Sequence, residues 1–327
     1  LNGIGQFGTR LQGGKDAAQS RYIFTKLNDI TRYLFHENDD TLCNYLDDDG
    51  QQIEPEYYYP ILPHVLLNGS QGIGTGYSTK IPMYNPKDIS QYILNYLSNV
   101  PFHENVKLTP WYRGFKGKIE SLCENSYIAR GIYTILDKST LKITELPIGV
   151  WTEDYIETLE KLSIEKGVET SKTFIKSYLD NSTEEKIDIT IKMNPETLLK
   201  FLDKLGKDGC NELENRLKLT SHISANNIYV FNAQSKMTKF NNVYDLIHEW
   251  IEERRKIYVK RRETILARLK NELNIITFKV QFIDEIITQK RTINNKKKTE
   301  IIEELKKDNY PLIKEKTNTN PSYDYLL

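Results

Sequence analysis

The sequence has little of what would make it a disulfide-stabilised, zinc-binding or membrane protein. It contains only 3 cysteines in 327 residues and no Cys-x-x-Cys pair, which argues against a disulfide framework and a zinc ribbon. It has no run of about 18 apolar residues, the length that a transmembrane helix requires. Its first residues, Leu1-Asn2-Gly3, resemble the interior of a longer protein and not a signal peptide. We therefore expect an intracellular protein without a membrane span.

The chain also lacks a net charge that would point to a nucleic-acid partner. Lysine plus arginine and aspartate plus glutamate number 45 each. The distribution is uneven, because residues 1–36 carry five basic and two acidic side chains and residues 37–59 carry eight acidic and no basic ones. Residues 251–314 carry 17 basic and 10 acidic side chains. A surface for nucleic acid must therefore be local.

Residues 1–85 are rich in glycine and aromatic residues, and their patterns predict short elements. Asp16 is expected to cap a short helical turn at residues 17–18. Residues 22–25 favour a strand, and the apolar spacing within residues 28–35 predicts a short helix. Short helices, a small sheet and glycine turns together are typical of a winged-helix domain.

Residues 86–245 alternate between strand and helix patterns. Residues 141–146 and 187–193 alternate apolar and polar side chains, as half-buried strands do. Residues 154–162 and 195–205 have helical spacing. We expect this region to be an α+β domain.

Residues 246–327 lack the residues that end helices. No glycine follows Gly209, and no proline lies between Pro195 and Pro311. A coiled-coil seam, with apolar residues three and four positions apart, is formed by Leu266, Leu269, Leu273, Ile276, Val280, Ile283 and Ile287. The pattern predicts a coiled-coil arm, and the three regions together predict an α+β multidomain fold.

The pair Arg21-Tyr22 is the first candidate for chemistry. A phenol has a pKa near 10 and is a poor nucleophile at neutral pH. An adjacent guanidinium favours the phenolate and stabilises charge on a phosphate during transfer. The alternative is that Tyr22, one of 21 tyrosines, packs in a strand.

The second candidate is the glycine-rich segment of residues 66–78, in which Ile73 lies between Gly72 and Gly74. The segment lacks the strand and helix context of a dinucleotide-binding loop. An apolar side chain on an exposed loop can wedge between base pairs and kink DNA. The alternative is a turn whose isoleucine fills the core.

Charged runs elsewhere carry simpler predictions. The acids at residues 47–49 lack further ligands at metal-binding spacing, so we expect a solvated loop and no metal site. Residues 8–16 depart from a P-loop, because Lys15 is followed by Asp16 and not by Ser or Thr. The basic runs 254–256 and 260–262 are expected to form a solvated helix face.

Five segments, read in order, resemble one known family. Gly5–Arg10, Gly13–Ala18 and Arg21-Tyr22 read Gly-Gln-Phe-Gly-Thr-Arg, Gly-Gly-Lys-Asp-Ala-Ala and Arg-Tyr. Glu54–Pro63 and Leu66–Ser78 follow them. Together they resemble the breakage–reunion region of type IIA DNA topoisomerases, specifically the eukaryotic and large-virus topoisomerase II branch.

The resemblance implies roles for individual residues. Tyr22 would attack a DNA phosphorus and form a 5′-phosphotyrosine, and Arg21 would stabilise the transition state. Ile73, 51 residues after Tyr22, would intercalate into DNA. The other residues expected to contact double-stranded DNA are Arg10, Lys15, Lys218, Thr220 and Ser221. For the last three, a solvated strand edge remains an equal alternative.

The resemblance also implies an assembly and cofactors. It implies that residues 86–245 are an α/β tower domain and that the coiled-coil arm has antiparallel helices. It also implies a homodimer, Mg²⁺ held by a preceding TOPRIM domain, and ATP bound by an ATPase domain. We expect this chain to be a central fragment that alone does not cleave DNA. The location would be the nucleus in a cellular eukaryote, or the host cytoplasm or virion for a virus.

Two other kinds of function stay open from the sequence. A non-catalytic DNA-bending module would keep Ile73 and the basic surfaces but would not need Tyr22. A coiled-coil scaffold would need neither residue.

Overall fold

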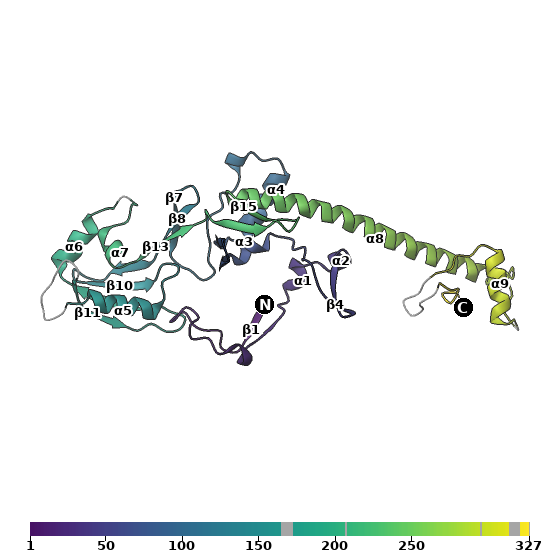
Figure 1. The fold of residues 1–327 in the computed structure, drawn as a ribbon, viewed down its shortest axis with the longest axis horizontal. Coiled ribbons are helices and arrows are strands. Elements are labelled where there is room, and N and C mark those ends of the chain that lie inside the picture. The colour runs from purple at the N-terminus through teal and green to yellow at the C-terminus, as the bar shows by residue number, and fades with distance from the viewer. Residues whose placement is uncertain (165–172, 207, 295, 314–320, 327) are drawn as a thin grey trace. The chain divides into compact units, whose positions relative to one another are not determined.

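The structure is a computed structural model that describes the chain except for residues 165–172, 207, 295, 314–320 and 327 (Figure 1). The chain divides into two compact units, Leu1–Arg254 and Arg255–Leu327. Helices and small antiparallel sheets occur together, which confirms the predicted α+β class. The division into three domains at residues 85 and 245 stays a prediction.

Short elements make up the first 85 residues. They are β1 (Asn2–Ile4), η1 (Ser20–Tyr22), β2 (Phe24–Lys26), α1 (Thr31–Leu34), α2 (Glu37–Asp40), β3 (Tyr45–Asp48), β4 (Gln51–Pro55), α3 (His64–Asn68), β5 (Ser70–Ile73) and β6 (Ser78–Ile81).

Longer strands and helices follow in the first unit. They are α4 (Pro86–Leu97), η2 (Phe102–Glu104), β7 (Lys118–Cys123), β8 (Ser126–Arg130), β9 (Ile132–Ile135), β10 (Thr140–Glu145), α5 (Thr152–Leu162), β11 (Ile175–Asp180), β12 (Ile189–Met193), α6 (Pro195–Asp203), α7 (Glu212–Arg216), β13 (Thr220–Ser224), β14 (Ile228–Phe231) and β15 (Met237–Phe240).

The local predictions for the first 35 residues hold in part. The predicted helix is present as α1, but the strand begins at Phe24 because Tyr22 ends the 3-10 turn η1. The predicted capping role of Asp16 is wrong. Residues 17–18 form no helical turn, and the Asp16 carboxylate accepts hydrogen bonds from Thr9 instead.

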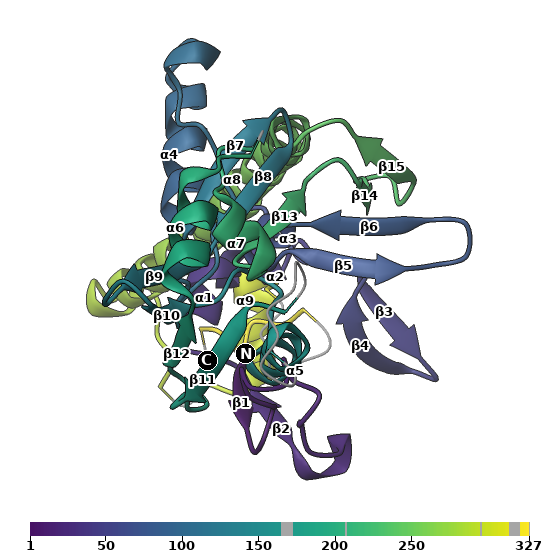
Figure 2. The same cartoon turned by 90° about the vertical axis from the view of Figure 1, so that its left-hand side faces the viewer.

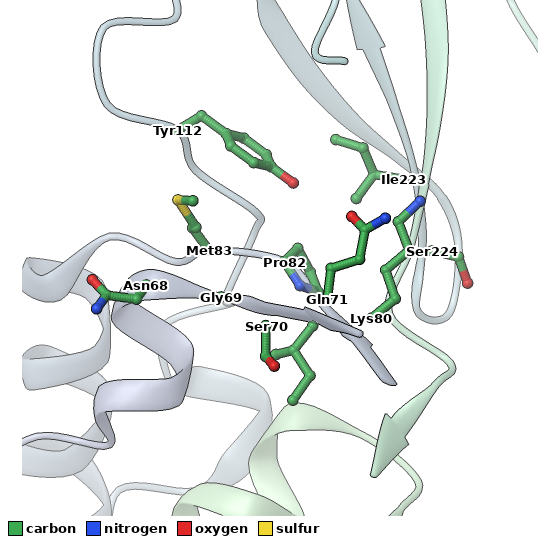
Figure 3. A pocket seen from close by; sticks show the side chains of 11 residues that line it. Asn68, Gly69, Ser70, Gln71, Lys80, Pro82, Met83, Tyr112, Ile223 and Ser224 are labelled. Carbon is green, nitrogen blue, oxygen red and sulfur yellow. The ribbon is translucent and has the colours of Figure 1, made fainter. Parts of the chain in front are cut away.

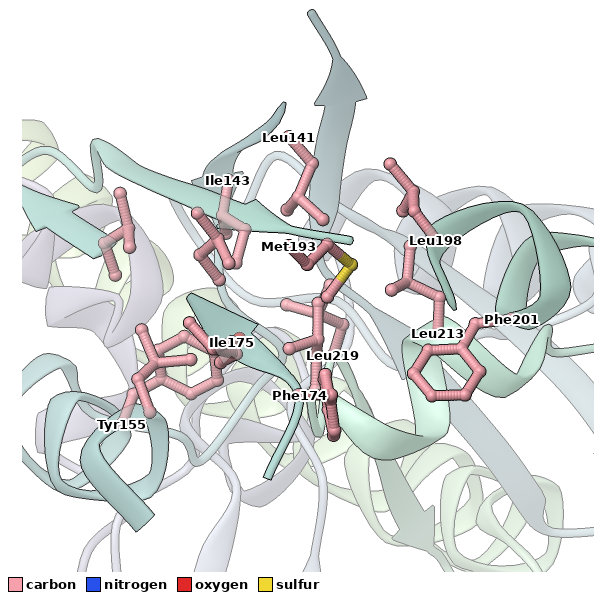
Figure 4. Close-up of a cluster of buried hydrophobic side chains, with 14 of the residues drawn as sticks. Leu141, Ile143, Tyr155, Phe174, Ile175, Met193, Leu198, Phe201, Leu213 and Leu219 are labelled. Carbon is pink, nitrogen blue, oxygen red and sulfur yellow. The ribbon is translucent and has the colours of Figure 1, made fainter. Parts of the chain in front are cut away.

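A four-stranded antiparallel sheet in the order β11-β12-β10-β9 organises the predicted tower region. Alternate residues of β10 and β12 are buried, as their period of two requires. They pack in one cluster with side chains of α5, α6 and α7 (Figure 4). The four predicted elements 141–146, 154–162, 187–193 and 195–205 are all present, with ends shifted by a few residues. We call this sheet and its three helices the sheet body.

A second core includes Leu66, the first residue of the glycine-rich segment. Leu66 of α3 and Ile89 of α4 pack with Ile228 of β14 and with Ile247 and Ile251. The last two belong to α8 (Val243–Ile287), the long helix expected from the absence of glycine and proline. The first turns of α8 are therefore part of the core of the first unit.

The second unit combines the C-terminal part of α8 with α9 (Lys298–Lys307). Phe282 of α8 packs with Ile301 and Leu305 of α9 and with Tyr310. All seven predicted seam residues lie on α8 and are exposed. The antiparallel partner that the seam predicts stays a prediction.

Candidate functional site

Tyr22 is presented to solvent at the end of η1. Its side chain is 63% exposed, so the alternative in which it packs in a strand does not describe the structure. The Arg21 guanidinium carbon lies 5.1 Å from the centroid of the Tyr22 ring. This is within the range of a cation–π contact, worth about 0.5–1 kcal/mol at an exposed site. Arg21 and Tyr22 are therefore neighbours in sequence whose side chains also contact each other.

The segment around Tyr22 is a long hairpin with a weak stem. The stem pairs β1 with β2, with Asn2 opposite Lys26 and Ile4 opposite Phe24. The Ala18 amide donates to the Gln6 carbonyl at 3.0 Å and continues the pairing toward the tip. The segment consequently leaves the stem at residue 5 and returns to it through Tyr22.

The tip of this hairpin, residues 9–16, is closed by a side-chain clasp. The Thr9 amide donates to both Asp16 carboxylate oxygens at 2.9 and 3.0 Å, and the Thr9 hydroxyl donates at 2.6 Å. The hydroxyl first, and then the amide, hold the pKa of Asp16 below its ordinary value. The Gly14 amide donates to the Thr9 carbonyl at 3.2 Å. We call residues 9–16 the tip loop.

Two predicted DNA-contacting residues of the tip loop lie against carboxylates of the sheet body. The Arg10 guanidinium forms an ion pair with Glu145, which is 1% exposed. The Lys15 ammonium lies 3.5 Å from Asp154, and both side chains are mostly exposed. An exposed pair of this kind contributes little and is screened by salt. Lys15 is thus accessible to a phosphate, whereas Arg10 is held by a buried partner.

Ile73 lies at the end of the β5–β6 hairpin and is 94% exposed. Figure 2 shows this hairpin with its connecting loop free of covering elements. The Gly74 amide donates to the Tyr77 carbonyl at 2.8 Å and closes the loop. The alternative in which the isoleucine fills the core is therefore wrong, and its DNA role stays a prediction.

A shallow pocket of about 180 Å³ lies at the base of this hairpin (Figure 3). Gln71 and Lys80 line it from β5 and β6, and Tyr112, Ile223 and Ser224 line it from the opposite side. Burial raises the pKa of the Tyr112 phenol, which keeps it a hydrogen-bond donor. Lys80, which lines this pocket from β6, was not among the residues predicted from the sequence.

Lys218, Thr220 and Ser221 lie at and before the start of β13. This strand is at the edge of the sheet β13-β8-β7. Lys218 is exposed in a turn with a φ of 50°, and the Ser221 hydroxyl donates to the Ile148 carbonyl at 2.8 Å. Lys218 is thus accessible, Ser221 is engaged within the protein, and their contact with DNA stays a prediction.

The prediction that residues 254–256 form a solvated helix face is wrong for Arg254. Its side chain is 4% exposed. One terminal nitrogen lies 2.7 Å from the Asp39 carboxylate, and the other donates to the Tyr59 carbonyl at 3.1 Å. A guanidinium can be buried when a carboxylate and a carbonyl replace its water. This pair ties α2 to the start of α8.

The acidic residues 47–49 are exposed around the β3–β4 turn, as predicted for a solvated loop. The Asp47 carboxylate accepts a hydrogen bond from the Gly50 amide at 2.9 Å. Across the part of the chain that the structure describes, no group of three His, Cys, Asp or Glu side chains is arranged to hold a metal ion. No helix among those same residues is both long and apolar enough to cross a membrane.

Comparison with known proteins gives a consistent result. Residues 1–325 match the family described as the A-type subunits of DNA gyrase/topoisomerase IV. The DNA topoisomerase 2 of Plasmodium falciparum is 42% identical over 310 residues, which are 95% of this chain and 21% of the relative. The mitochondrial DNA topoisomerase 2 of Dictyostelium discoideum is 42% identical over 305 residues, 93% of this chain and 22% of the relative.

A solved structure agrees with these relatives. The crystal structure of the Plasmodium falciparum topoisomerase II DNA-binding, cleavage and re-ligation domain superimposes with a TM-score of 0.82 at 40% identity. The match covers 100% of this chain and 42% of that chain. The chain spans about a fifth of the length of the curated relatives. The resemblance to eukaryotic topoisomerase II is confirmed, and the chain belongs to the DNA gyrase/topoisomerase IV family.

Proposed function

We propose that this chain is the breakage–reunion region of an ATP-dependent type II DNA topoisomerase, with Tyr22 as the nucleophile. The observation that carries the proposal is the exposed Tyr22 side chain beside the Arg21 guanidinium, in a chain whose residues 1–325 match the family. A tyrosine that attacks DNA must be reachable by a phosphodiester, and 63% exposure meets that requirement.

The proposed step is a transesterification. The Tyr22 phenolic oxygen attacks a backbone phosphorus in line, an oxygen–phosphorus bond forms, and the bond to the 3′ oxygen breaks. The phenol loses a proton and the leaving oxygen gains one, so the products are a 5′-phosphotyrosine and a 3′-hydroxyl. Arg21 stabilises the negative charge that the phosphate carries during transfer. Religation is the reverse step and needs no energy input.

The proposed reaction uses Mg²⁺ and ATP, but the described residues offer no binding site for either. These residues hold no group suited to a metal ion, and the nearest P-loop-like segment has Asp16 where a P-loop needs Ser or Thr. They therefore do not fit either group. In our proposal Mg²⁺ and ATP bind elsewhere in the protein, in a TOPRIM and an ATPase domain.

DNA binding would use the hairpin and the basic side chains. Ile73 would enter a base step and kink the duplex, at a cost of about a few kcal/mol for the unstacked step. Lys15 and Lys218 would contact phosphates without reading sequence. In the proposed homodimer each Tyr22 attacks one strand. The proposed location is intracellular, the nucleus in a cellular eukaryote or the host cytoplasm or virion for a virus.

A DNA-bending module is the second candidate, because the 94% exposure of Ile73 suits a wedge whether or not Tyr22 reacts. The substitution Tyr22→Phe separates the two in the complete protein. Labelled supercoiled DNA is incubated with the protein and Mg²⁺, the mixture is denatured and proteolysed, and the DNA-linked peptide is identified by mass spectrometry. We expect the adduct on the Tyr22 peptide, and none with Tyr22→Phe.

The matched control is Tyr33→Phe, which removes the hydroxyl of another exposed tyrosine in the same region. It should keep the adduct. An adduct that survives Tyr22→Phe, or no adduct in the wild type with DNA still bound, would favour the bending module.

A further inference from the structure

Glu145 is a buried carboxylate that binds groups from the tip loop, from Lys116 and from its own neighbour Leu146. It lies at the end of β10 and is 1% exposed. It accepts hydrogen bonds from the Lys116 amide at 3.3 Å and from its neighbouring Leu146 amide at 3.1 Å, and it forms the ion pair with Arg10. A buried carboxylate needs such partners. Arg10 is its partner from the tip loop.

Trp151 provides a second attachment, directly before α5. A Cβ built on Gly13 would lie 2.3 Å from the Trp151 indole, so the tip-loop backbone rests directly on the ring. The Glu153 amide donates to the Leu11 carbonyl at 3.0 Å, and the Gln12 amide side chain donates to the Glu153 carboxylate at 3.0 Å. The tip loop is therefore bound to the sheet body by an ion pair, a packing contact and hydrogen bonds.

The stem that carries Tyr22 has no comparable support. β1 and β2 have three residues each, and none is buried. An isolated two-stranded ribbon is marginally stable at best in water. η1 lies between this ribbon and the tip loop and also buries no residue. The position of Tyr22 must therefore depend on where the tip loop is held.

We propose that Glu145 and Trp151 are positioning residues for the reaction of Tyr22. They hold the tip loop against the sheet body, and the tip loop holds η1 at one end while the β1–β2 stem holds it at the other. This inference rests on the proposed function of Tyr22. It assigns Arg10 to Glu145 and not to a DNA phosphate.

The first test compares two adjacent glycines in the complete protein. Gly13→Ala places a methyl group into the Trp151 ring, whereas a Cβ on Gly14 meets no atom within 4 Å. Both glycines have positive φ, 63° and 88°, so either alanine carries backbone strain, and the strain is the greater at Gly14. A larger loss in Gly13→Ala than in Gly14→Ala therefore reports the contact with Trp151.

The second test removes the charge of Glu145 and keeps its shape, as Glu145→Gln. Its control is Asp188→Asn, which removes a carboxylate that lies directly before β12 and pairs with Lys142. If Glu145→Gln does not fold, the glycine pair still decides the question. Circular dichroism and the unfolding midpoint identify that case.

Two measurements are made on each variant. Hydrogen exchange reports the amides of Ala18 and Tyr22, which donate to Gln6 and Gln19. Single-turnover formation of the DNA adduct reports the chemistry, and DNA affinity is measured separately. We expect Gly13→Ala and Glu145→Gln to lose exchange protection and to form the adduct about 10- to 100-fold more slowly at unchanged DNA affinity. Asp188→Asn should behave as the wild type, and Gly14→Ala should lose much less of both than Gly13→Ala.

Equal rates for Gly13→Ala and Gly14→Ala, or a loss confined to DNA affinity, would overturn the inference. A faster or unchanged rate for Glu145→Gln would do the same, because it would mean that Arg10 does not position the loop. Failure of the proposed function is a distinct result, since the wild type would then form no Tyr22 adduct, whatever the exchange data show.

Discussion

The tip loop with its stem and the sheet body differ in how they are held. The sheet body buries alternate residues of β10 and β12 under three helices, whereas β1, η1 and β2 bury no residue. The tip loop is attached to Glu145 and Trp151, whereas the sheet body is ordered by its own core. The comparison teaches that the exposed Tyr22, which we propose as the nucleophile, can take its order from a neighbouring core. The four measurements below extend this contrast between buried and exposed positions.

The largest effect on stability is expected at Arg254. Arg254→Ala leaves the Asp39 carboxylate, which is 4% exposed, buried without its guanidinium partner. Removing one member of a buried pair destabilises a protein by about 3–5 kcal/mol. Urea unfolding would measure the change. Arg255→Ala, at the exposed next position, is the control and should have a much smaller effect.

A similar loss is expected in the sheet body itself. Leu159→Ala truncates a fully buried side chain of α5 and should lower the free energy of unfolding by about 2–5 kcal/mol. Leu199→Ala truncates an exposed leucine of α6 and should change it by less than about 0.5 kcal/mol. Equal losses at the two leucines would show that the cluster in Figure 4 is not the core.

At Ile73 we expect a substitution to change DNA bending and to leave the free energy of unfolding nearly unchanged. Because the side chain is exposed, Ile73→Ala should leave the free energy of unfolding within about 0.5 kcal/mol of the wild type. It should reduce the bending of bound DNA, measured by energy transfer between dyes at the ends of a short duplex. Ile135→Ala, an exposed isoleucine of β9, should leave bending unchanged. Unchanged bending in Ile73→Ala would contradict the wedge.

The smallest effect concerns pH and the Thr9–Asp16 clasp. The pKa of Asp16 lies below its ordinary value of 3.8 because Thr9 donates to the carboxylate. The stabilisation is therefore present above 3.8 and is lost as the pH falls through the lowered pKa. The NMR shift of the Thr9 amide should stay constant from about pH 7 to pH 5 and titrate with a midpoint below 3.8. In Asp16→Asn this titration should vanish, and a midpoint above 3.8 in the wild type would refute the clasp.

Features that depend on local pattern could be predicted from the sequence. The long helix α8 follows from the absence of glycine and proline, and the strands around Leu141 and Ile191 follow from alternation. The candidate tyrosine and isoleucine follow from glycine-rich segments that resemble a known family. These signals extend over a few residues to a few tens of residues, which is the range in which periodicity and motifs operate.

Features that depend on distant partners could not be predicted. Asp39 and Arg254 are 215 positions apart, and Arg10 and Glu145 are 135 apart. No spacing in the sequence marks such pairs. The basic neighbours of Arg254 favour a solvated face, and the two alanines after Asp16 favour a helix cap. In both cases a contact made by the folded chain decides the outcome instead.

The β5–β6 hairpin has one more property that bears on Ile73. It is not an isolated ribbon, because the Lys80 amide donates to the Asn227 carbonyl at 2.8 Å and Asn227 leads directly into β14. The Asn227 amide side chain also donates to the Ser78 hydroxyl at 2.8 Å. A binding segment that is already rigid loses little conformational entropy on association. In the proposed function, Ile73 would therefore enter DNA on a preorganised support, and little of its binding free energy would be spent on ordering the hairpin.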